Sequence, residues 1–255
     1  MSIDNINRRD FLSGCTKTAG GIAASFVLVS SQETVGQVAN SVSPPKGTGR
    51  KLSDGYRLPE LRFGYHAFEP FISESCLRQH HLYYHGSHVK GFNQALSDLS
   101  DTTTKESQEL AQIHQRLQYH ANGHFNHMLF WENITPQPVE LGSFQALSSQ
   151  IVRDFGSIEA FIRLFLEAAR SLENEGWGVL LWQAGIQRLL VTSTQDGGLF
   201  PSSSALLVID LSEHAYLDSC QSRETYLQQL WKFIDWACVA ERFIRVTQPL
   251  GEHWL

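Results

Sequence analysis

The chain has 255 residues, of which 42% are hydrophobic and 18% are charged, a composition that supports a globular protein with a sizeable buried core. Its formal net charge is -6 and no block of basic residues runs along it, which argues against a dedicated nucleic-acid-binding protein. The 11 histidines are more informative, because imidazole binds metals and exchanges protons near neutral pH.

The N-terminus has the pattern of an export signal. Arg8 and Arg9 are followed by Phe11 and by an apolar stretch, so we predict a twin-arginine-type signal over residues 1–31 and a location in the periplasm or cell envelope. The apolar stretch is too short for a membrane span, and we expect no stable span once the signal is removed. An ordinary helix of the fold is the alternative for this segment. Residues 32–55, with Ser, Gly, Thr and a Pro pair, predict a flexible linker.

Helical patterns dominate the next part of the chain. Residues 73–99 and 104–131 have the length and apolar spacing of two long helices, which predict an antiparallel hairpin. A polar, proline-bearing break follows at residues 132–143. We therefore place an N-terminal helical hairpin domain at residues 56–137.

The remaining residues, 138–255, mix helix and strand. A helix capped by Ser157 is predicted first and a helical stretch closes the chain. Three apolar runs between them predict strands, at residues 177–183, 187–194 and 205–210. The fold class is therefore α+β: the hairpin is followed by an α/β domain with a three-stranded antiparallel sheet flanked by helices.

Polar residues that bind metals lie at selected places in these elements. His80, Tyr84 and His88 are four residues apart and share one helical face. His127 lies near the end of the second long helix, among aromatic residues, while Asp210 and His214 follow the third strand. Three imidazoles and one carboxylate suit a first-row transition metal, with room for a solvent molecule. A hydrogen-bonded structural role is the alternative for each histidine taken alone.

Five collinear motifs resemble the iron/manganese superoxide dismutase family from Leu58 to the C-terminus. They are "LPELRFGYHAFEPFISESCLRQHHLYYHGSHVKGFN", "NGHFNHMLFW", "FGSIEAF", "GWGVLL" and "DLSEHAY". The resemblance implies that His80, His127, Asp210 and His214 bind one manganese or iron ion. It also implies a ping-pong redox cycle that converts superoxide to dioxygen and hydrogen peroxide.

The resemblance also suggests which metal is used. Manganese-type members have glycine four residues before the second-helix ligand and glutamine near the strands, whereas many iron-type members carry the glutamine on that helix. Gly123 precedes His127 by four and Gln195 lies in "TSTQDGG", so the pattern slightly favours manganese. Gln195 would act on solvent at the metal; a solvated turn residue is the alternative for it.

Departures from the family pattern gather around the predicted site. The residues at the family's histidine and gateway-tyrosine positions are exchanged, with Tyr84 and His88 in their places as candidate catalytic groups. Ser212 replaces a tryptophan, which opens space for water, and Leu217 replaces a tyrosine, while Trp177 is retained. Because imidazole titrates closer to neutrality than phenol, we expect His88 to govern the pH dependence of turnover.

Glu213 matches the family residue that reaches the partner subunit, so a homodimer is expected; an exposed carboxylate at a helix start is its alternative role. The altered residues leave a second hypothesis, a non-enzymatic metal-binding relative with the same fold. A hydrolase that uses Ser212 beside His214 is a third, for which no oxyanion-hole motif is present.

Overall fold

The computed structural model describes residues 55–100, 102–195, 198–219 and 222–248. The predicted export signal, and the predicted linker up to residue 54, lie outside the described residues.

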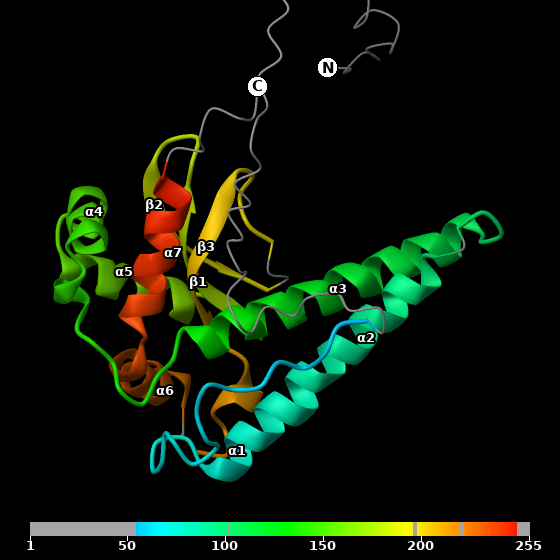
Figure 1. Ribbon diagram of the computed structural model, residues 1–255, viewed down its shortest axis with the longest axis horizontal. Helices are drawn as coiled ribbons and strands as arrows, with labels where there is room; N and C mark the ends of the chain where they lie inside the picture. The colour runs from blue at the N-terminus through cyan, green and yellow to red at the C-terminus, as the bar shows by residue number, and fades with distance from the viewer. Residues whose placement is uncertain (1–54, 101, 196–197, 220–221, 249–255) are drawn as a thin grey trace, which may run out of the picture. The chain divides into compact units, whose positions relative to one another are not determined.

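A long helical hairpin forms the first part of the structure (Figure 1). Its first arm joins α1 (Glu74–Arg78), a stretch of π-helix named η1 (Gln79–His85) and α2 (Gly86–Asp98), and its second arm is α3 (Ser107–Glu132). Ser73 starts the first arm, because its Oγ accepts a hydrogen bond from the backbone N–H of Cys76 at 3.2 Å. The predicted hairpin is confirmed, but the π-helical turn within its first arm has no counterpart in the predicted elements.

The second part alternates helices with a small sheet. Ser157 caps the helix that begins at Ile158 as predicted, since its Oγ accepts from the N–H of Ala160 at 3.1 Å. Gly156, with φ of 91°, ends the preceding helix in a backbone conformation that glycine adopts readily. The elements in chain order are η2 (Leu141–Ser143), α4 (Gln145–Phe155), α5 (Ile158–Arg170), β1 (Trp177–Gln183), β2 (Arg188–Thr194), β3 (Ser203–Asp210), η3 (Glu213–Ala215), α6 (Arg223–Leu230), η4 (Trp231–Phe233) and α7 (Trp236–Thr247).

The three strands form an antiparallel sheet in the order β2-β1-β3, as the sequence predicts. β1 is central and nearly all of its residues are buried, which explains why it is a continuous apolar run rather than an alternating one. Trp177 pairs with Asp210 at one end of the β1–β3 ladder. A polar residue at the end of a buried strand is therefore held beside a large aromatic residue.

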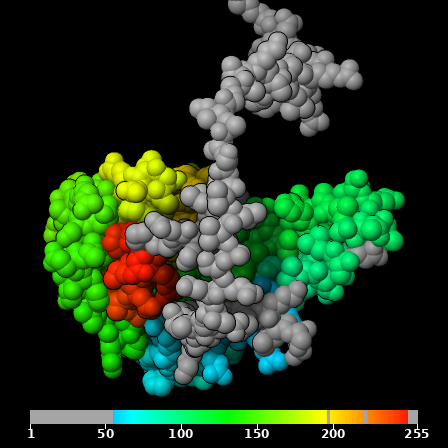
Figure 2. Space-filling model, turned by 45° about the horizontal axis from the view of Figure 1, so that its top comes forward, coloured from blue at the N-terminus to red at the C-terminus, as the bar shows by residue number. Residues whose placement is uncertain are grey.

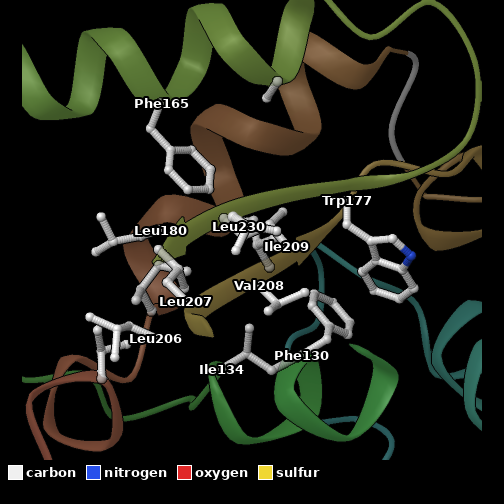
Figure 3. Close-up of a cluster of buried hydrophobic side chains, with 14 of the residues drawn as sticks. Phe130, Ile134, Phe165, Trp177, Leu180, Leu206, Leu207, Val208, Ile209 and Leu230 are labelled. Atoms are coloured by element: carbon white, nitrogen blue, oxygen red, sulfur yellow. The ribbon is translucent and has the colours of Figure 1, made fainter. Parts of the chain in front are cut away.

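Helices from both parts of the chain cover the sheet (Figure 3). Phe165 of α5 lies on one face of the strands, while Phe130 of α3 and Ile134 lie on the other. All three side chains are at most 1% exposed and belong to one hydrophobic core. The end of the hairpin thus contributes to the core of the α/β part, which fixes the two parts relative to each other.

A buried asparagine joins the two parts just after α3. Asn133 is fully buried; its Nδ2 donates to the carbonyl of Val208 at 2.9 Å and its Oδ1 accepts from Arg242 at 2.5 Å. Its carbonyl also accepts from the N–H of Asp235 at 2.7 Å. These bonds link the end of the hairpin to both β3 and α7.

The distal ends of α2 and α3 stand clear of the sheet and its helices (Figure 2). No helix within the described part of the chain has the length and apolar character needed to cross a membrane.

Candidate metal centre

Four side chains from both parts of the chain converge at one buried point. His80 comes from η1, His127 from α3, Asp210 from the last position of β3 and His214 from η3. One potential ligand atom from each lies within 4.8 Å of all the others. Asp210 Oδ2 is 3.0 Å from His80 Nε2, 3.3 Å from His214 Nε2 and 3.5 Å from His127 Nε2. The structure thus brings together all four predicted ligands.

Backbone groups set the orientation of this cluster. Asp210 Oδ1 accepts a hydrogen bond from the N–H of Ser212 at 2.9 Å, which leaves Oδ2 for the imidazoles. The chain then turns through η3, so that His214 returns toward Asp210 four residues later. His127 Nδ1 donates to the carbonyl of Gly123 at 2.6 Å, and this bond leaves the lone pair of the neutral ring on Nε2.

Burial and mutual contact shift the protonation of these groups. Burial alone would raise the pKa of Asp210, but hydrogen bonding and charge from His214 and His80 hold that pKa well below its usual range. Burial lowers the pKa of His127 well below that of free imidazole. Burial opposes charge on His214 too, yet the carboxylate of Asp210 raises its pKa. The cluster therefore combines an ionised carboxylate with imidazole nitrogens.

The donor atoms fit a transition-metal ion. Nε2 of His127 and Nε2 of His214 are buried and have no hydrogen-bond partner among the described residues, although both lie within 3.5 Å of Asp210 Oδ2. Unpartnered buried nitrogens that face a carboxylate are costly unless a cation sits between them. Three nitrogens and one oxygen are a ligand set suited to manganese or iron.

Aromatic rings enclose the ligand imidazoles. Tyr84 stacks on His214 with 4.0 Å between ring centroids and an interplanar angle of 12°. His85 stacks on His127 at 5.0 Å and 8°, and Trp177 meets His127 edge-on at 4.9 Å. The rings restrict rotation of two ligands, so the donors are arranged before any ion binds.

One side of the cluster opens into a polar pocket of about 170 Å³. This volume is large enough to hold water, and Ser212, where the family has an indole, is among the lining residues. His127 and His214 reach it directly. Its lining includes the predicted non-ligand site residues with the exception of Glu213: Tyr84, His88, Gly123, Trp177, Gln195 and Ser212.

His88 and Gln195 line the pocket without forming a hydrogen bond to each other in the described structure. Burial, followed by the nearby imidazole of His120, lowers the pKa of His88 to about 4. This shift favours a neutral ring at pH 6–8, whereas the sequence leads us to expect titration near neutrality; the pH profile of turnover distinguishes the two.

Two acidic residues lie near His214. Glu213 is exposed on η3. Glu175 is 71% exposed at the side chain, and its Oε1 lies 4.0 Å from His214 Nδ1 within the same chain. The sequence reasoning missed Glu175, because nothing in the pattern before Trp177 indicates that the strand starts beside the ligand.

A second group of histidines, also missed as a network, lies next to His127 outside the pocket lining. Trp131 Nε1 donates to His85 Nδ1 at 3.1 Å, so His85 Nε2 carries the hydrogen that it shares with His124 Nδ1 at 2.8 Å. His81 contacts the hydroxyl of Tyr65 and the carbonyl of residue 59, each at 2.8 Å. These side chains pack against one another and hydrogen-bond to protein groups.

Comparisons with known proteins identify relatives of the whole described region. The family model for iron/manganese superoxide dismutases, alpha-hairpin domain, matches residues 55–135, and the model for their C-terminal domain matches residues 143–242. A mitochondrial manganese superoxide dismutase from Penicillium chrysogenum is 33% identical over 206 residues, which cover 78% of this chain and 98% of the relative. An iron superoxide dismutase from Methanothermobacter marburgensis is 35% identical over 193 residues, covering 74% and 96%. A manganese superoxide dismutase from Mycobacterium lepraemurium is 33% identical over 200 residues, covering 75% and 94%.

Proposed function

Because the chain belongs to the iron/manganese superoxide dismutase family, we propose that it converts superoxide to dioxygen and hydrogen peroxide at the His80, His127, Asp210 and His214 cluster. The observation that carries this proposal is the pair of buried, unpartnered Nε2 atoms that face the Asp210 carboxylate. Relatives named as manganese and as iron enzymes support either metal.

When bound, manganese or iron supplies a redox couple that takes one electron from a first superoxide and gives one to a second, with two protons completing the peroxide. The chain's own residues hold that centre and the substrate. Asp210 contributes negative charge, and the His127 ring is fixed by its bond to Gly123. His88 and Gln195 present polar groups to the pocket where an anion would bind. Trp177, only 6% exposed, shields one side of the pocket from bulk water.

We favour manganese slightly over iron. The supporting observation is that the position four residues before His127 is Gly123, while the glutamine that lines the pocket, Gln195, comes from the end of β2. In the family pattern this combination accompanies manganese. The metal content of protein purified after growth with both metals tests the preference.

We propose a homodimer in which Glu213 reaches the partner's site. Exposure of Glu213 and a 53% exposed Leu217 support a contact surface beside η3. Light scattering of the protein and of a Glu213→Ala variant, whose dimer should be weaker, tests this arrangement.

We also propose export through the twin-arginine-type signal at residues 1–31, with Arg8 and Arg9 as the recognised pair. Replacing both arginines by lysine should leave the protein in the cytoplasm. Cell fractionation of the two forms measures the difference.

The activity is tested by following superoxide directly after a pulse of the radical, with protein loaded separately with manganese and with iron. Fast, metal-dependent decay supports the proposed function. A protein that binds the ion through all four ligands but leaves the decay at its spontaneous rate would instead be a non-enzymatic relative with an altered pocket.

A further inference from the structure

The two arms of the hairpin carry the same four-residue pattern. Residues 88–91 of α2 read His-Val-Lys-Gly and residues 120–123 of α3 read His-Ala-Asn-Gly. A Cβ on Gly123 would lie 2.1 Å from His88 Nδ1, and a Cβ on Gly91 would lie 2.3 Å from His120 Nε2. Each imidazole therefore occupies the space that a side chain on the facing helix would fill. We name these four residues the histidine–glycine interlock.

The two imidazoles of the interlock also touch each other. Their ring centroids are 5.5 Å apart and the rings meet edge to face, at 67°. Tyr119 packs against both, at 5.1 Å from His88 and 5.0 Å from His120. Nδ1 of each histidine is buried without a hydrogen-bond partner among the residues that the structure describes. Packing, rather than directed hydrogen bonds at these atoms, therefore holds the rings in place.

Only one of these histidines reaches the metal pocket. His88 lines it and lies 5.5 Å from the ligand His127, between ring centroids, whereas His120 is outside the lining. Because the Nδ1 edge of His88 rests on Gly123, Nε2 is the ring nitrogen that remains to face the pocket. If His120 moved away from Gly91, His88 would lose its ring contact with His120. The His88 ring would then be less firmly held in this orientation.

We propose that His120 is a positioning residue for the metal pocket: by packing over Gly91 it holds the His88 imidazole over Gly123, with Nε2 directed at a small anion bound beside the metal. The inference rests on the proposed metal centre. It concerns how firmly the hydrogen-bonding group is held, since a group left free to rotate donates less effectively to a bound anion.

The test is a double-mutant cycle read out by azide binding. Azide is a small anion that takes an open coordination position on iron(III), and its dissociation constant is measured by absorbance on iron-loaded protein without any turnover. In the presence of His88, His120→Ala should weaken azide binding at least about threefold. In a His88→Ala background the same change should have an effect of less than about 1.5-fold.

Three further variants sharpen the result. His120→Phe keeps a ring over Gly91, so its azide affinity should stay within about twofold of the parent. His114→Ala, an exposed histidine on the same helix, should leave azide binding unchanged. Gly91→Ala displaces the His120 ring by another route and replaces His120→Ala if that variant does not fold.

Unchanged or tighter azide binding in His120→Ala, an equal weakening in both backgrounds, or a loss in His120→Phe as large as in His120→Ala would overturn the positioning role. If the parent protein binds iron but no azide, the open coordination position is absent. That result would contradict the proposed function as well. In contrast, if azide binds and His120→Ala weakens it equally with and without His88, only the positioning role of His120 is contradicted.

Discussion

The two sides of His127 are built in opposite ways. On one side, Trp131, His85 and His124 form a dry chain of directed hydrogen bonds, and all three side chains are at most 4% exposed. On the other, Tyr84, His88 and Gln195 line an open polar pocket. Three of the departures from the family pattern, Tyr84, His88 and Ser212, line this pocket, where a change alters hydration and substrate contact. We call the hydrogen-bonded group of Trp131, His85 and His124 the dry side and the lining of the pocket the pocket side. We expect changes on the dry side to affect mainly stability and changes on the pocket side to affect mainly activity.

The largest effect should come from removing the carboxylate of Asp210, which faces all three ligand imidazoles. Asp210→Ala removes the only anionic ligand and leaves two buried Nε2 atoms without their counter-charge, so metal affinity should fall at least about 100-fold and turnover should be lost. Metal content after dialysis and superoxide decay measure both. Asp218→Ala, an exposed aspartate eight residues later, is the control; full metal retention in Asp210→Ala would refute the assignment of the site.

A substitution on the dry side should lower the free energy of unfolding more than a substitution on the pocket side. His85→Ala opens a cavity and strands both Trp131 Nε1 and His124 Nδ1, which should lower the free energy of unfolding by about 3 kcal/mol. His88→Ala, which breaks no hydrogen bond in the described structure, should cost about 1 kcal/mol. Urea unfolding of the metal-free variants measures both values. Equal losses would mean that the two sides do not differ as described.

Changing the pocket side should act on turnover instead. His88→Phe keeps a ring over Gly123 but removes the nitrogen that faces the pocket, so turnover should fall about 10-fold. Because the pKa of His88 is about 4, the ring is neutral from pH 6 to 8 and gains a proton only as pH approaches 4. The ratio of parent to variant turnover should therefore be constant from pH 6 to 8; an inflection between pH 6 and 7 would contradict the neutral state.

The smallest effect concerns protons on the dry side. Burial lowers the pKa of His124 to about 4, below the value of about 6.5 expected in the unfolded chain. Between these values the unfolded state binds the additional proton, so the contribution of His124 to stability is complete above pH 6.5 and is lost as pH falls toward 4.

Metal-free His124→Asn should consequently show a shallower dependence of the free energy of unfolding on pH near pH 5.5, by up to about one proton. Urea titrations at several pH values measure the slope. The exposed His114→Asn should leave the slope as it is. A His124→Asn slope identical to that of the parent would show that His124 is protonated in the folded state.

The sequence predicted the three strands and the hairpin from local periodicity, and it predicted the four ligands from the resemblance to the family motifs around them. Asp210 ends the third strand and His214 follows four residues later, so the sequence could place these two side chains close together. It did not predict the stacking of Tyr84 on His214 or the approach of Glu175, which depend on how η3 packs against η1 and against the segment before β1. Nor could periodicity show the π-helical turn, since the spacing of polar residues through it is also compatible with an α-helix.

Two of the four donors come from the helical hairpin and two come from the end of the sheet. An ion held among them would therefore cross-link the hairpin to the sheet, and its free concentration would enter the folding equilibrium of the chain. Without the ion, the core contacts and direct bonds such as those at Asn133 and the Arg242–Glu132 ion pair still join the regions. Metal supply would then affect the stability of the folded chain as well as its chemistry.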